Sequence, residues 1–436
     1  MTTETKQLKF EKDEISQFSK GRGEPDWMHD LRLQALSAAE ELEMPRPEKT
    51  RIKGWNFTDF QYDAESEKLN SLDDLPENIR TLIGQNEEAG NTLVHRNSTL
   101  AYSELSEELS EKGVIFTDIE TALKEHGDLV KKYFMQAVDV REHRLTALHT
   151  ALLNSGTFLY VPKNVEIKVP LQSVYWKDNH ETGLINHVLI VAEDHSSVTY
   201  VENYLSEDED HSSVANIVAE VYAGQNARIA YGAVDNFSKG VTTYVNRRGL
   251  TSRDGKIEWA LGQMNDGNTL SDNTTNLVGD GSFTDTKSVS VGRGDQSQNF
   301  VTRVTHYGKG SEGYILTHGV MKDKAKSIFN GISKVEHGAA KASSEQTERV
   351  LMLSEGARGD ANPILLIDEN DVEEAGHAAS VGRIDPVQMY YLMSRGITRK
   401  EAQRLIIHGF LAPVVDQLPI EGVKKQLVEV IERKMR

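Results

Sequence analysis

Hydrophobic and polar positions divide the chain into helical ends and a long middle region with the pattern of strands. Between Gly156 and about Ile367, short segments of Val, Ile, Thr, Tyr and Phe alternate with turns of Gly, Asp and Asn, a composition typical of strands and their connections. The last apolar run, Pro363–Asp368, contains four consecutive Ile and Leu residues. It predicts a strand that is buried on both faces.

A loose repeat runs through this middle region. A turn followed by an apolar residue returns at intervals of 26 to 31 residues, at Val198, Ile229, Ile257, Phe283 and Tyr314. In a β-solenoid each coil buries its apolar face against its neighbours, so one such unit is expected per coil. The pattern alone leaves a sandwich or a barrel open as alternatives to this β-helix.

Residues 385–436 carry the clearest helix signals. The Asp-Pro pair at 385–386 provides an N-cap acceptor and a proline at the first helical position, and this helix should stop at Gly396. The Thr-x-x-Glu sequence at 398–401 is a capping box that opens a second helix. A third helix, from about Pro419, should cover an open hydrophobic surface. Its apolar stripe consists of Ile420, Val423, Leu427, Val430 and Ile431.

The N-terminal part mixes helices with short strands. A helix begins at the Glu-Pro pair 24–25, and strands at Thr92–Arg96 and Val114–Thr117 suggest a small α/β unit, with a capping box at 117–120. A further helix should end at Gly156, where glycine tolerates the left-handed conformation. We therefore expect three domains. They are an N-terminal helical and α+β domain (1–155), a β-rich core (156–384) and a C-terminal helical domain (385–436).

The composition removes several kinds of chemistry. A formal net charge of −18 leaves no excess of Lys and Arg to neutralise phosphates, so we do not expect nucleic acid as a partner. The absence of cysteine excludes disulfides, thiolate nucleophiles and cysteine ligation of a cluster by this chain. Without a membrane-length apolar run or an N-terminal export signal, we expect a cytoplasmic protein that does not bind a membrane.

Few residues suggest a site on their own. His377 lies in a glycine-flanked segment that we interpret as a turn, where a structural hydrogen bond and a metal-binding role both remain open. The acidic run 207–211 suits a solvated loop better than a calcium site, because it lacks the required glycine turn. His306 could meet His318 or His337 on neighbouring coils, but the sequence does not give the register.

Several segments resemble the SufB/SufD family, the scaffold proteins of iron–sulfur cluster assembly. The strongest are His377-Ala-Ala-Ser-Val-Gly-Arg-Ile-Asp385 and Tyr391-Leu-Met-Ser-Arg-Gly-Ile397. The resemblance implies a mainly β fold with a right-handed parallel β-helix core between an N-terminal α/β and a C-terminal α-helical domain. Because no cysteine is present to receive sulfur, the chain looks like the SufD type.

The resemblance also implies a function and partners. A SufD-type chain would be a scaffold without enzymatic activity, paired with a SufB-type, cysteine-bearing homologue or, in isolation, with a second copy of itself. A SufC-type ATPase would dock on residues 386–415, and we expect its contacts at Tyr390, Tyr391, Arg404, Leu405, Ile406 and Phe410.

His377 would lie near the partner's cysteine and contribute an imidazole ligand to the nascent cluster. We expect no tightly bound cofactor, only transient iron or an iron–sulfur cluster in the assembled complex. The alternatives are a polysaccharide-active β-helix enzyme and a purely structural solenoid.

Overall fold

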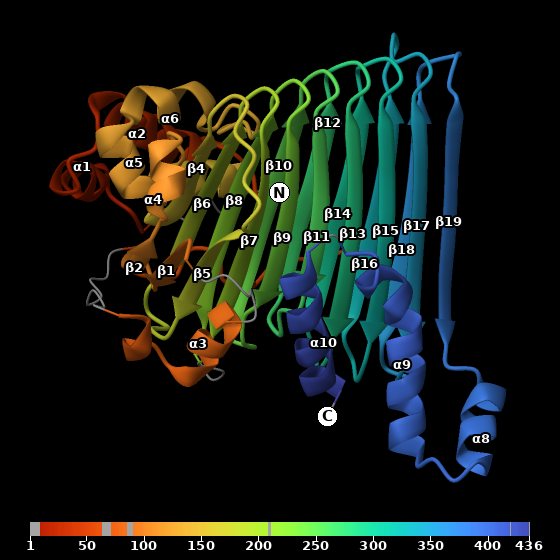
Figure 1. The fold of residues 1–436 in the computed structure, drawn as a ribbon. Coiled ribbons are helices and arrows are strands. Elements are labelled where there is room, and N and C mark those ends of the chain that lie inside the picture. Colours follow the sequence, from red (N-terminus) through yellow and green to blue (C-terminus); the bar gives the residue numbers. More distant parts are fainter. Residues whose placement is uncertain (1–8, 63–70, 85–89, 208–210, 419, 436) are drawn as a thin grey trace.

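The computed structural model shows a β-helix of two facing sheets, with helices before and after it in the chain (Figure 1). It describes residues 9–62, 71–84, 90–207, 211–418 and 420–435. Along the β-helix the chain alternates between the sheets, so consecutive strands belong to different sheets. This confirms a mainly β chain with a solenoid core and helical ends.

Within the described residues, one sheet has ten strands and the other has nine. In spatial order, the ten-stranded sheet consists of β2 (Thr99–Glu104), β1 (Thr92–Arg96), β5 (Leu171–Lys177), β7 (Ser197–Ser206), β9 (Arg228–Asn236), β11 (Lys256–Gln263), β13 (Phe283–Gly292), β15 (Glu312–Met321), β17 (Ser343–Met352) and β19 (Glu374–Arg383). The nine-stranded sheet consists of β3 (Ile115–Asp118), β4 (Ser155–Val161), β6 (Leu184–Ala192), β8 (Ser213–Ala223), β10 (Val241–Thr251), β12 (Thr269–Leu277), β14 (Ser297–His306), β16 (Lys326–Val335) and β18 (Arg358–Ile367).

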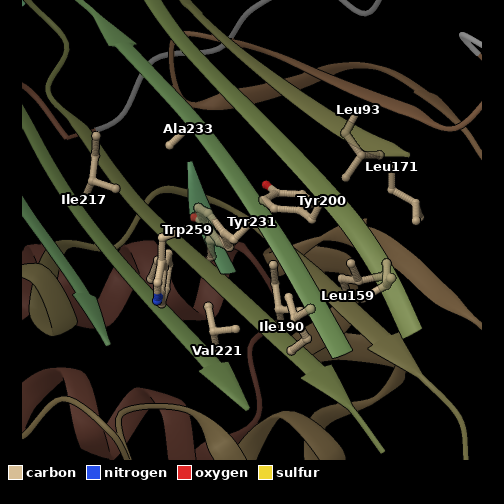
Figure 2. Packing of buried hydrophobic residues seen from close by; sticks show 14 of the residues in the cluster. Leu93, Leu159, Leu171, Ile190, Tyr200, Ile217, Val221, Tyr231, Ala233 and Trp259 are labelled. Carbon is tan, nitrogen blue, oxygen red and sulfur yellow. The ribbon is translucent and has the colours of Figure 1, made fainter. Parts of the chain in front are cut away.

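Neighbouring coils pair in parallel, and the spacing of partners gives the length of one coil. Partners lie between 26 residues apart, as for Thr243 and Thr269, and 32 residues apart, as for Lys326 and Arg358. Side chains alternate between the two faces of a strand, so every second residue points between the sheets. In the first coils this interior is apolar and aromatic, with Tyr200, Tyr231 and Trp259 packed in a column (Figure 2).

The predicted repeat has the right register in its first three members and the wrong one afterwards. Val198 pairs with Ile229 and Ile229 with Ile257, but Ile257 pairs with Thr284 instead of Phe283. A shift of one residue moves a side chain to the opposite face of the sheet. Phe283 and Tyr314 therefore lie on the outer face, with their ring centroids 5.9 Å apart.

The N-terminal helices cluster at one end of the solenoid (Figure 1). They are α1 (Lys12–Gly21), α2 (Asp26–Glu41), the 3₁₀ turn η1 (Leu72–Asp74), α3 (Glu77–Gly84), α4 (Glu107–Glu111), α5 (Ile119–Glu125), α6 (Gly127–Tyr133) and α7 (Arg144–Leu152). Helix α7 packs between α2 and the strands β6 and β8 of the nine-stranded sheet. The strands of the predicted α/β unit do not form a sheet of their own: β1 pairs with β5 and β3 with β4, so they extend the two sheets of the β-helix.

Two local predictions near this end are also wrong. Helix α7 ends at Leu152, and Gly156 lies inside β4, where an added Cβ would clash with the carbonyl oxygen of His187. The glycine is thus required by the close approach of β6. The cap of α5 is Asp118, whose Oδ1 accepts a hydrogen bond from the amide of Thr121 at 3.0 Å.

The C-terminal helices α8 (Pro386–Ser394), α9 (Arg399–Val415) and α10 (Glu421–Met435) follow β19. The capping box at 398–401 and the cap at Asp385 are confirmed, and Gly396 has a φ of +85° directly after α8. Helices α9 and α10 lie on the outer face of the ten-stranded sheet, against strands β9 to β15 (Figure 1). Within the described ranges, no helix has both the length and the apolar character needed to span a bilayer.

Candidate functional site

The C-terminal end of the β-helix is open. Strands β18 and β19 are the last strands of their sheets, and each has only one neighbour within the described part of the chain. Leu366, Ile367 and Val381 are 46%, 44% and 42% exposed. The prediction that Pro363–Asp368 is buried on both sides is therefore wrong for this chain, because no further coil covers the strand.

His377 lies in the middle of β19, at the rim of this open end. The predicted turn is wrong: residues 374–383 pair in parallel with β17, and His377 is the partner of Gln346. The side chains of Gln346 and Glu348 point into the solenoid, so their in-register partners His377 and Ala379 face the same way. His377 is nevertheless exposed, because no strand is stacked on the far side of β19.

Two polar side chains lie in the coil directly beneath His377. Gln346 and Glu348 are 2% and 1% exposed and extend across the interior towards Gly331 on β16. Within the described residues, Gln346 Oε1 and Glu348 Oε2 have no hydrogen-bond partner. Burial raises the pKa of the Glu348 carboxyl to about 7. Neither residue was predicted to belong to a site, because their only signal in the sequence is polarity within an alternating strand pattern.

The predicted ATPase contacts divide into exposed and partly buried side chains. Tyr390 and Tyr391 on α8 are 74% and 56% exposed, and Leu405 on α9 is 49% exposed. Ile406 and Phe410 instead pack partly against the cluster between α9, α10 and the ten-stranded sheet. The exposed members thus form the surface of this helical region, while the other two attach α9 to the β-helix.

Further contacts fix α9 in place. The Phe410 ring stacks on His318 of β15 with centroids 4.8 Å apart, and the Phe410 carbonyl accepts a hydrogen bond from His318 Nδ1 at 2.7 Å. Glu432 on α10 lies 3.6 Å from Arg404 Nε and 2.5 Å from His408 Nε2. Arg404 is therefore held at the junction of α9 and α10 with its side chain half exposed.

The other candidate residues do not assemble into a site. His306 is buried in β14, His318 contacts α9, and His337 lies in an exposed turn beside Glu369, so these histidines are not brought together. The acidic run 207–211 includes residues 208–210, which lie outside the described residues. Within the described ranges, no group of three or more His, Asp or Glu side chains is arranged to hold a metal ion.

Comparisons with known proteins agree with this architecture. Residues 175–410 match the family described as "SUF system FeS cluster assembly, SufBD core domain", and residues 21–173 match the SufBD N-terminal region. The chain is 62% identical to the iron-sulfur cluster assembly protein SufD of Bacillus subtilis over the whole of both chains. It is 29% identical over 416 residues to SufBD family proteins of Staphylococcus haemolyticus and Staphylococcus aureus, covering 93% of this chain and 89% of theirs.

The two matches cover the parallel β-helix, including its open end, and helices that surround it. The chain belongs to the SufBD family of the SUF iron–sulfur cluster assembly system. Within this family it is most like SufD. The matches support neither a polysaccharide-active enzyme nor a purely structural solenoid.

Proposed function

We propose that the chain is the non-ATPase scaffold subunit of a SUF iron–sulfur cluster assembly complex and is not itself an enzyme. The observation that carries the proposal is the open C-terminal end of the β-helix, where apolar side chains are exposed beside His377. A solenoid that functions alone gains stability by covering such an end with a capping element. This end therefore suits a partner that completes the core.

The partner that fits best is a SufB-type homologue with the same fold and a cysteine at its own end. Strands β18 and β19 offer unpaired backbone groups to another pair of strands, and Leu366, Ile367 and Val381 offer apolar area. In the absence of that homologue, a second copy of this chain occupies the same surface. Light scattering of the isolated protein at roughly tens of micromolar, a concentration suited to a weak interface, should then detect a dimer. A strict monomer would contradict the proposed self-association.

His377 contributes an imidazole to cluster building at this interface. A neutral imidazole is a suitable ligand for iron beside a thiolate, and the thiolate must come from the partner because this chain has no cysteine. Iron and the cluster are cargo in this proposal, and no cofactor is tightly bound. The localisation expected for such a complex is the cytoplasm.

The test of the site compares two exposed histidines. His377→Ala should leave folding and complex assembly unchanged but sharply lower cluster formation in cells that depend on this system. His195→Asn is the matched control, because His195 is exposed and lies in the turn between β6 and β7, several coils from the open end, at a positive φ that asparagine tolerates. Native purification with identification of partners by mass should recover the ATPase and the homologue. Normal cluster maturation by the His377 variant would rule out the ligand role.

The SufC-type ATPase docks on helices α8 and α9 in this proposal. Tyr390, Tyr391 and Leu405 provide exposed apolar and aromatic area of the kind that anchors interfaces. Tyr391→Asp and Arg404→Glu should each weaken the pull-down of the ATPase, whereas Tyr307→Asp, at a 48% exposed position on the β-helix, should not. Unchanged binding in both helix variants, with folding intact, would remove this region from the interface.

A further inference from the structure

The interior beneath His377 contains buried polar side chains. In the column of Glu348, Thr317 lies one coil further in and Ser288 two coils further in, and their hydroxyl oxygens hydrogen-bond to each other at 2.8 Å. Gln346 Oε1 and Glu348 Oε2 have no such side-chain partner among the described residues, although both side chains are buried, and the Glu348 carboxyl receives hydrogen bonds only from the backbone amides of Gly331 and Asn362. An unsatisfied buried acceptor costs about 1–3 kcal/mol, so a donor is expected to reach them in the working state.

The register shows which donor is closest. Adjacent strands of a sheet lie about 4.8 Å apart, so His377 is stacked directly on Gln346 and diagonally on Glu348. Ala379 is the partner of Glu348 and Pro363 is the partner of Gly331. Neither has a side-chain donor. Among His377, Ala379 and Pro363 of the last coil, only His377 has a side-chain N–H that can donate a hydrogen bond to the two oxygens.

Both acceptors are held at the middle of the interior. A Cβ placed on Gly331 would lie 2.6 Å from Gln346 Oε1 and 2.7 Å from Glu348 Oε1, so the two side chains converge on the space that this glycine leaves open. Gln346 Nε2 donates to the carbonyl oxygen of Ile364 at 3.1 Å. This bond uses one of the two N–H groups of the Gln346 amide and leaves the amide oxygen as an acceptor for the histidine.

We propose that Gln346 and Glu348 are positioning residues for His377, which accept the inward N–H of its imidazole and direct the other ring nitrogen out of the open end. The inference rests on the proposed role of His377 in cluster assembly. A histidine that binds a metal usually donates its second ring N–H to a carboxylate or carbonyl, which fixes the tautomer and the ring orientation. The last coil thus supplies the ligand, and the coil beneath it supplies the acceptors.

The test removes the acceptors while preserving the volume of the side chains. Gln346→Leu combined with Glu348→Leu should keep the fold and the assembly with the partner, because replacing unsatisfied buried polar groups by apolar groups is nearly neutral or stabilising. Cluster formation by the purified complex should fall roughly 10-fold or more, the usual effect of losing the acceptors behind a metal ligand. In the otherwise native chain, Glu348→Gln keeps an acceptor oxygen and should retain most of the rate of cluster formation.

A second readout reports on the imidazole directly. In protein labelled with ¹⁵N-histidine, the His377 resonances, identified by their loss in His377→Ala, should show one fixed tautomer in the native chain. The double leucine variant should show averaged tautomers. Glu345→Ala is the matched control, because Glu345 lies on the same strand with its side chain on the exposed outer face, and it should change neither readout.

The outcomes separate this inference from the function on which it rests. If His377→Ala lowers cluster formation but the double leucine variant matches the native chain in rate and tautomer, the positioning role is wrong and the proposed function stands. If His377→Ala has no effect on cluster formation, the proposed function of this residue fails and the positioning role fails with it. If the double variant does not fold, ¹⁵N spectra of Glu348→Leu alone decide the matter, and an unchanged tautomer overturns the proposal.

Discussion

The attachment of α10 to the β-helix allows a quantitative prediction. Leu427 is fully buried and lies over Gly262 of β11, where an added Cβ would be 3.2 Å from Leu427 Cγ and far inside contact distance of Cδ2. Leu427→Ala leaves a cavity at this contact and should cost about 2.7–5 kcal/mol. Gly262→Ala overfills the same contact and should cost about 1–3 kcal/mol.

The double variant separates direct packing from two independent effects. The methyl group introduced by Gly262→Ala would occupy part of the space vacated by Leu427, so Gly262→Ala with Leu427→Ala should cost less than the sum of the single variants by about 0.5–3 kcal/mol. Native-state hydrogen exchange of the α10 amides is the suitable assay, because it measures the opening of one helix separately from global unfolding.

A matched control is available on the same helix. Val428 is the next residue, and it is 39% exposed, so Val428→Ala should change the opening free energy of α10 by no more than about 0.5 kcal/mol. Strictly additive costs at Gly262 and Leu427 would refute the packing argument. Unchanged exchange of the α10 amides in Leu427→Ala would refute the role of this helix as a cover for the ten-stranded sheet.

The remaining predictions concern buried charge, pH and salt. Arg247→Met leaves the buried carboxylates of Glu202 and Asp235 without their guanidinium partner, 2.9 and 2.6 Å away, and should destabilise the β-helix by about 3–5 kcal/mol in urea unfolding. Burial lowers the pKa of His306 from 6.5 to about 4, so the folded state binds fewer protons between these values. The contribution of His306 to stability is fully present above pH 6.5 and falls by about 3 kcal/mol as the pH drops through this range; His306→Gln should remove this part of the pH dependence, while His95 and His143, whose pKa values burial also lowers to about 4, keep theirs. The exposed pair Lys9–Asp59 should contribute under about 1 kcal/mol, and Lys9→Ala should not change the melting temperature measurably.

The sequence by itself determined the elements whose signals are local. The capping box at 398–401 and the apolar stripe of α10 depend on residues within a few positions of one another, and both are present as predicted. The strand-and-turn composition between Gly156 and Ile367 indicated a β-rich core, but it left a sandwich or a barrel open, and the resemblance to a family favoured the β-helix. The absence of cysteine likewise limited the metal chemistry without any structure.

Only the tertiary structure decided the register, the state of the last coil and the surroundings of His377. Residues 374–383 contain Gly, Ala and Ser with little intrinsic preference for a strand, and their strand exists because β17 provides a pairing edge. The apolar run before them predicted burial, but a strand at the end of a solenoid has no coil to cover it. Gln346 is the partner of His377 in the neighbouring coil, 31 positions earlier in the chain, and this pairing brings Gln346 and Glu348 under His377. A one-residue change in any turn between these residues would move their side chains to the outer face.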